Sequence, residues 1–128
     1  MKPSALILSA TLLIVSQAAL ADGECDKYTT SYDQTYCMAK IFVESDKDLN
    51  TIYKDLQAVI DADSKKSLTL VQRKWIKYRD NSCESKGTID VDCNYKVNRD
   101  RAQYLTDRLR ECRGGTCRKD MIGQESWK

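Results

Sequence analysis

Apolar residues in the middle of the chain recur with the period of an α-helix. One stripe follows intervals of three and four residues through Leu49, Ile52, Tyr53, Leu56 and Ile60. Residues at this spacing lie on one face of a helix, where they can be buried together. Upstream, Thr30 or Ser31 is suited to cap the helix, because a hydroxyl oxygen accepts a hydrogen bond from a free amide of the first turn. The pattern predicts a first helix from about Ser31 to Ile60.

A second helix is expected from about Ser64 to Glu84. Its apolar positions at helical spacing are Leu68, Val71, Trp75 and Tyr78. The polar run before it, residues 61–64, is typical of a turn followed by a helix cap. Gly87 is the expected stop, since glycine readily takes the left-handed backbone conformation found after the last turn of a helix.

The third predicted helix follows Asp90 and Asp92, whose negative charges suit the positive end of a helix dipole. Its buried side is expected at Ala102, Leu105, Leu109 and Cys112, and Gly114-Gly115 is expected to end it. Connections this short place consecutive helices side by side and antiparallel. The predicted fold class is therefore all-α, a small three-helix antiparallel domain stapled by disulfides.

The two ends of the chain differ from this helical part. Residues 1–21 carry Lys2 as their only charge, are mostly apolar and end in Ala19-Leu20-Ala21, which predicts a cleaved export signal. The helical domain is then expected at 22–117, and a flexible tail at 118–128. No cysteine directly follows the small-residue run, so no lipid anchor in the membrane is expected, and the location is expected to be periplasmic or secreted.

All six cysteines follow the predicted signal: Cys25, Cys37, Cys83, Cys93, Cys112 and Cys117. An even number in an exported chain indicates three disulfides, although six cysteines allow 15 pairings. Proximity in the sequence favours pairing each cysteine with its nearest neighbour along the chain. A zinc site is not expected, because the chain has no histidine and no Cys-x-x-Cys motif.

Charge and composition argue against several classes of function. The formal net charge is only +2 and the two signs are interspersed, which disfavours a dedicated nucleic-acid binder. The absence of histidine removes the commonest general base, and no nucleophile motif is present. We therefore expect no enzyme activity, no cofactor and no metal, and interpret the chain as a protein that binds another protein.

Two strings of residues in the first and second predicted helices are specific when they occur together. The first string contains Asp46, Leu49, Asn50, Tyr53 and Leu56, and the second contains Gln72, Arg73, Trp75, Ile76, Tyr78, Arg79, Asp80 and Cys83. Together with Cys25-Asp26, Cys37 and the arginines after Cys93, they resemble the LprI-like N-terminal domain. This is a family of exported bacterial proteins named for a lysozyme inhibitor, and the resemblance runs from about Cys25 to Arg110.

The resemblance implies a small helical domain that binds and blocks a lysozyme of c-type and so protects the bacterial cell wall. Most of the motif residues are interpreted as structural. Tyr53, Trp75 and Tyr78 are expected in the core, and Arg79 is expected to pair with a carboxylate of the first helix such as Asp46. Asn50 is expected to bond the backbone of a neighbouring helix or loop.

Two loops are the predicted contacts with a lysozyme, because each carries a cation and is flanked by cysteines. One contains Lys86, Gly87 and Thr88, and the other begins at Arg113. Rigid loops with cations suit a cleft that holds two catalytic carboxylates. The alternative hypothesis is a periplasmic adaptor or immunity protein of the same fold that binds no lysozyme.

Overall fold

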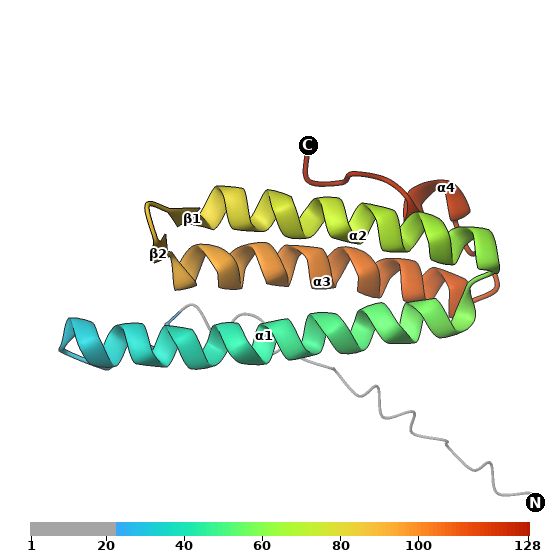
Figure 1. Ribbon diagram of the computed structural model, residues 1–128. Helices are drawn as coiled ribbons and strands as arrows, with labels where there is room; N and C mark the ends of the chain where they lie inside the picture. The colour runs from blue at the N-terminus through green and yellow to red at the C-terminus, as the bar shows by residue number, and fades with distance from the viewer. Residues whose placement is uncertain (1–22) are drawn as a thin grey trace, which may run out of the picture.

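Three long helices run along most of the molecule, and each is antiparallel to the next one in the chain (Figure 1). The computed structural model describes residues 23–128, and its long helices are α1 (Ser31–Val59), α2 (Ala62–Cys83) and α3 (Val91–Arg113). In the view of Figure 1, α3 lies between α1 and α2, and its closest packing is against α1. The predicted all-α fold with three antiparallel helices is confirmed.

Each long helix begins at a polar cap. The side chains of Thr30, Asp61 and Asp90 each accept a hydrogen bond from the backbone amide three residues further on, at 3.1, 2.8 and 2.9 Å. Such a bond satisfies one of the amides that the first turn of a helix leaves without a partner. Because Asp61 rather than Ser64 is the cap, α2 begins two residues earlier than the sequence pattern predicted.

A two-stranded hairpin joins α2 to α3, where only a helix stop was predicted. Strand β1 (Glu84–Ser85) pairs antiparallel with β2 (Thr88–Ile89). Lys86 and Gly87 form the turn with positive φ values of 50° and 78°. A two-residue turn with both φ values positive matches the twist of a hairpin, and glycine at the second position favours it.

The core forms where the three helices face one another, with a contribution from the C-terminal residues. Its members are Leu49, Leu56, Ile60, Leu68, Val71, Trp75, Leu105, Leu109 and Ile122. Tyr53 packs against this cluster from a partly buried position, as expected. Tyr78 differs from the prediction, because its side chain lies at the surface and stacks at a tilt against Trp127 with ring centres 5.9 Å apart.

Three disulfides join the neighbouring cysteines favoured by sequence proximity. Cys25 is bonded to Cys37, Cys83 to Cys93, and Cys112 to Cys117. The first ties the N-terminal segment to α1, the second closes the base of the hairpin, and the third lies where α3 ends. Covalent closure of short loops reduces the freedom of the unfolded chain and stabilises a domain with a small core.

The last eleven residues, expected from the sequence to form a flexible tail, make contacts with the helical bundle. They contain the short helix α4 (Lys119–Ile122), and Ile122 is fully buried in the core. The hydroxyl of Tyr104 donates to the backbone carbonyl of Met121 at 2.5 Å, and Lys74 pairs with Glu125 at 2.7 Å. Although the segment is mostly polar, Ile122 lies in the core and Trp127 packs against it.

The predicted export signal, residues 1–21, lies outside the described residues. Within residues 23–128, no helix combines the length and the apolar character needed to cross a membrane. The same residues contain no group of histidine, cysteine or acidic side chains arranged to hold a metal ion.

Candidate functional site

Nine of the residues that carry the sequence motif line one groove between α1 and α2. The groove has a volume of about 470 Å³, and its motif residues are Asp46, Leu49, Asn50, Tyr53, Gln72, Arg73, Trp75, Ile76 and Arg79. Helical spacing explains this gathering, because both strings repeat at three and four residues and so place their members on facing sides of two helices. The motif therefore lines one continuous groove, and two of its lining residues, Leu49 and Trp75, also belong to the core.

Arg79 ties the three long helices together at the end of this groove. Its Nη1 atom donates to Asp46 of α1 and to Asn98 of α3, both at 3.2 Å, while Nε and Nη2 donate to Asp80 at 3.0 and 2.9 Å. Its guanidinium also lies over the ring of Trp75, 5.4 Å from the centre. The predicted contact between Arg79 and Asp46 is confirmed, and a fork with this many partners fixes the register of the helices.

Two other motif residues of the groove, Tyr53 and Asn50, make hydrogen bonds with fewer partners than Arg79. The hydroxyl of Tyr53 accepts from Gln57 at 2.8 Å and lies 3.3 Å from the hydroxyl of Thr69 on α2. Asn50 differs from the prediction: its amide nitrogen donates to Asp46 within α1, at 3.3 Å, rather than to the backbone of a neighbouring element. The expected backbone bond is not made because Asn50 is exposed, one turn of helix from Asp46.

The hairpin is the second candidate site, and it projects from the end of α2 and α3 (Figure 1). All the residues of its two strands and turn are exposed. The hydroxyl of Thr88 donates to the carbonyl of Ser85 at 2.6 Å, and the amide of Asp90 donates to the carbonyl of Cys83 at 2.9 Å. With the disulfide from Cys83 at its base, the turn is held by covalent and hydrogen bonds without being covered by any neighbouring element.

The structure separates the two predicted contact loops. The hairpin with Lys86, Gly87 and Thr88 lies at the start of α3, whereas Arg113 lies at its end. The 23 residues of α3 span about 34 Å at 1.5 Å per residue. Arg113 also pairs with Asp55 of α1 at 3.6 Å. The two loops therefore do not form one compact surface.

The clearest electrostatic perturbation near the helix ends involves the C-terminal residues. A hydrogen bond from the ammonium of Lys119, together with the backbone amide of Ser64, holds the pKa of Asp61 far below its ordinary value. Hydrogen bonds from Lys128 and Lys74 likewise lower the pKa of Glu125. The pairs of Lys119 with Asp61 and of Lys74 with Glu125 attach the C-terminal residues to the bundle, whereas Lys128 and Glu125 both belong to the C-terminal residues. The three lysine side chains are exposed, and solvent weakens such attractions.

Comparison with known families identifies the family of this chain. The family model described as lysozyme inhibitor LprI matches residues 25–105. The chain belongs to the LprI family. No curated protein and no solved structure matches it significantly. The LprI match takes in the groove, the hairpin and the first two disulfides, but it ends before Arg113, the third disulfide and α4.

The LprI family is named for a lysozyme inhibitor, which implies a protein partner. The sequence pointed to the residues of both candidate sites, but it predicted neither the groove nor the hairpin that these residues form. A sequence signal for the hairpin did exist. Glycine at the second position of a two-residue loop favours the hairpin turn that is found at Lys86-Gly87. The groove had none, since its formation depends on how far α1 and α2 stand apart across α3.

Proposed function

We propose that this protein is exported and inhibits a lysozyme of c-type by inserting the hairpin loop, residues 85–88, into the substrate cleft. The observation that carries the proposal is the LprI family match, which includes the hairpin and its disulfide but excludes the loop at Arg113. Export is supported by three disulfides, which persist in oxidising compartments such as the periplasm, and by the expected signal at 1–21.

The chemistry of the hairpin loop suits a lysozyme cleft. Such a cleft cleaves a glycosidic bond with two carboxyl groups, so a cation that enters it gains attraction as water is displaced. Lys86 is exposed at the turn, and Gly87 beside it adds no side chain, which keeps the turn narrow. The disulfide between Cys83 and Cys93 holds the loop in one shape before binding, which limits the entropy lost on association.

Charge around the loop favours approach to a basic enzyme. Glu84 and Asp90 flank the turn and are both exposed. Acidic groups at the rim with a single cation at the centre complement a basic surface that surrounds an acidic cleft. The nearly neutral net charge of the whole chain therefore does not prevent local steering of the hairpin.

Charge reversal at the hairpin tests the proposal against a matched control. Inhibition of c-type lysozyme is titrated with the oxidised protein from Asp22 onward, as the wild type, Lys86→Glu and Arg113→Glu. Glutamate at 86 places a negative charge against the cleft carboxylates and should raise the inhibitory concentration at least tenfold, about 1.4 kcal/mol. Arg113→Glu reverses the same charge at the other end of α3 and should leave inhibition unchanged.

Equal inhibition by wild type and Lys86→Glu would reject the hairpin as the inhibitory element. Absence of inhibition by the wild type across several lysozyme types would reject the function itself, and would favour the adaptor or immunity role with another protein partner.

A further inference from the structure

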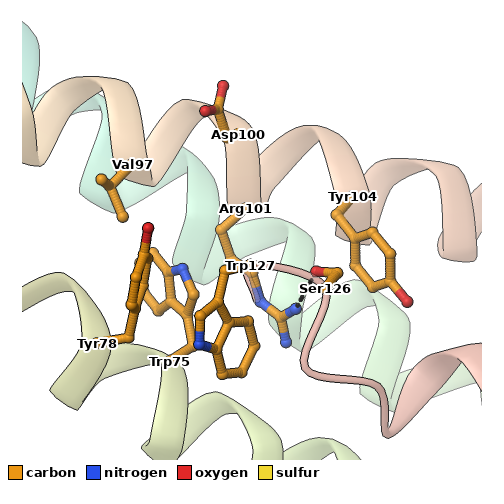
Figure 2. Close-up of a pocket in the computed structure, with 8 residues that line it drawn as sticks. All are labelled: Trp75, Tyr78, Val97, Asp100, Arg101, Tyr104, Ser126 and Trp127. Atoms are coloured by element: carbon orange, nitrogen blue, oxygen red, sulfur yellow. Dashed lines mark hydrogen bonds between the residues drawn. The ribbon is translucent and has the colours of Figure 1, made fainter.

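A second cavity lies between α2, α3 and the C-terminal segment, which is defined here as residues 118–128. Its volume is about 290 Å³. Figure 2 shows Trp75 and Tyr78 reaching it from α2, Val97, Arg101 and Tyr104 from α3, and Trp127 from the C-terminal segment. The protein has two tryptophans, and both line this cavity. Five of its eight lining residues are therefore aromatic or apolar, and the other three are Arg101, Ser126 and Asp100.

Arg101 is buried but incompletely bonded. Only 2% of the residue is exposed. Its Nε atom donates to the side-chain carbonyl of Gln72 at 3.0 Å, and Nη1 donates to the hydroxyl of Ser126 at 3.5 Å, the dashed line in Figure 2. Within residues 23–128, Nη2 is the buried side-chain nitrogen or oxygen that lacks any hydrogen-bond partner. A buried donor without an acceptor costs free energy and so indicates a missing acceptor.

Comparison with Arg108 shows what Arg101 lacks. Both arginines lie on α3 over the ring of Tyr104, and both are buried. Arg108 donates through Nε and Nη2 to both carboxylate oxygens of Glu111, at 2.8 and 2.7 Å, and this bond raises its pKa. In the described part of the chain, no carboxylate pairs with Arg101, and burial lowers its pKa to about 10.

The nearest acidic neighbour in the sequence does not compensate this charge. Asp100 lies 3.8 Å from Arg99, is mostly exposed, and points away from the Arg101 guanidinium in Figure 2. The rings of Tyr104 and Trp127, with centres 5.4 and 5.2 Å from the guanidinium carbon, supply the favourable contacts of Arg101 with π faces. An aromatic pair stabilises a cation, but it accepts none of the directed hydrogen bonds that the fork offers.

We propose that this cavity binds a small organic carboxylate with an apolar or aromatic body, and that Arg101 anchors the carboxylate. Nη1 and Nη2 present two parallel donors, the geometry that a carboxylate accepts with both oxygens. On binding, Nη1 exchanges its long hydrogen bond to Ser126 for a hydrogen bond to one carboxylate oxygen. The unpartnered Nη2 donates to the other carboxylate oxygen. The apolar body then packs against Trp75, Tyr78 and Val97.

Binding requires a small movement of the C-terminal segment. Ser126 and Trp127 lie beside the guanidinium, whereas the other walls come from the long helices α2 and α3. The segment lies beyond residue 105, where the family match ends, so the site combines family helices with a part of the chain outside the match. The proposal is independent of lysozyme inhibition, and its test needs no lysozyme.

The test compares benzoate with its neutral analogue benzamide. In the wild-type protein, the indole N–H signals of Trp75 and Trp127 are followed by nuclear magnetic resonance while each compound is added. Benzoate should shift both signals in a saturable way, and benzamide should bind at least about tenfold more weakly, because it lacks the charge that the guanidinium recognises. No saturable shift with benzoate, or an equal response to both compounds, would overturn the proposal.

Two variants locate the site, and each is first checked for native helix content. Arg101→Gln should weaken benzoate at least tenfold, whereas Arg110→Gln, an exposed arginine on the same helix, should bind as the wild type does. Val97→Phe fills the cavity without touching the guanidinium, and should also abolish binding. Full benzoate affinity in folded Arg101→Gln or in Val97→Phe would contradict the assignment, and Val97→Phe decides it if Arg101→Gln does not fold.

Discussion

The hairpin and the C-terminal segment are both associated with a short disulfide-closed loop, yet one stays exposed and the other is docked. The bond between Cys83 and Cys93 spans the hairpin, while the bond between Cys112 and Cys117 precedes the C-terminal segment. Ile89 of the hairpin is 60% exposed, whereas Ile122 of the C-terminal segment is fully buried. The disulfide alone therefore does not decide whether a segment is available to a partner.

The difference arises from where each segment can place its apolar side chains. The hairpin turns within two residues at the extreme end of two helices, so Ile89 has no core within reach. The C-terminal segment turns back along α2 (Figure 1), which brings Ile122 to the core and Trp127 against it. Buried apolar area stabilises the docked segment, and the absence of such burial leaves the hairpin free to contact another protein.

Truncation of the isoleucine in each segment should give the largest difference. Ile122→Ala removes a fully buried side chain and should lower the free energy of unfolding by about 2–5 kcal/mol. Ile89→Ala, at an exposed strand position, should change it by about 0.5 kcal/mol or less. Urea unfolding followed by circular dichroism measures both, and similar values for the two variants would remove the distinction between a docked and an exposed segment.

Removal of each disulfide should separate stability from inhibition. Replacing Cys83 and Cys93 by alanine, or Cys112 and Cys117 by alanine, should each lower the free energy of unfolding by about 2–3 kcal/mol, because both close short loops. Only the first pair of substitutions should weaken lysozyme inhibition at temperatures where both variants remain folded. Loss of inhibition in the second variant alone would place the inhibitory surface at the other end of α3.

Alanine substitutions at two glycines with positive φ should have smaller effects on stability, and they form a matched pair. Gly87 and Gly115 have φ values of 78° and 86°, and a Cβ atom added at either meets no atom within 4 Å. Alanine at each position should therefore cost only the left-handed backbone conformation, about 1 kcal/mol. Thermal unfolding should show similar losses, while weaker inhibition is expected for Gly87→Ala alone. An unchanged inhibitory concentration in that variant would argue against a role for the turn conformation.

Acid should loosen the C-terminal segment by the smallest of these effects. The pKa values of Asp61 and Glu125 are lowered from ordinary values of 3.8 and 4.5 by their lysine partners. Carboxylates with lowered pKa contribute stability above those ordinary values, and lose it as pH falls through the lowered ones. The indole signal of Trp127 should therefore change below about pH 4. Lys119→Met should reduce the share of this acid-induced change that arises from Asp61. If the variant responds to acid as the wild type does, the Asp61–Lys119 pair does not contribute to it.

Helices, disulfide partners and family were accessible from the sequence because each depends on local spacing. The stripe through Leu49 and Leu56 needs only the helical period, and neighbouring cysteines are brought together by short loops. The docking of the C-terminal segment was not accessible, because its three apolar residues, Met121, Ile122 and Trp127, stand among polar ones without a helical period. The burial of Arg101 could not be predicted for a related reason. A helix with several arginines looks solvent-exposed in the sequence, and only the packing of α1 and α2 against α3 shows which of its arginines are buried.

The candidate site was accessible only in part. The motif residues were named, yet their joint lining of one groove depends on the separation of α1 and α2, which no local pattern encodes. Lys86, Gly87 and Thr88 remain a predicted contact, now on an exposed, disulfide-closed hairpin. Arg113 was grouped with them by charge and by a flanking cysteine, and the length of α3 separates it from them.

Competition for the lysozyme cleft tests the central claim most directly. Binding of the oxidised protein to c-type lysozyme is measured by titration calorimetry, alone and with a chitin oligosaccharide that saturates the substrate cleft. A hairpin that inserts into the cleft predicts that the apparent Kd rises in proportion to the oligosaccharide concentration. Tight binding with a Kd unaffected by the oligosaccharide would contradict occlusion of the cleft.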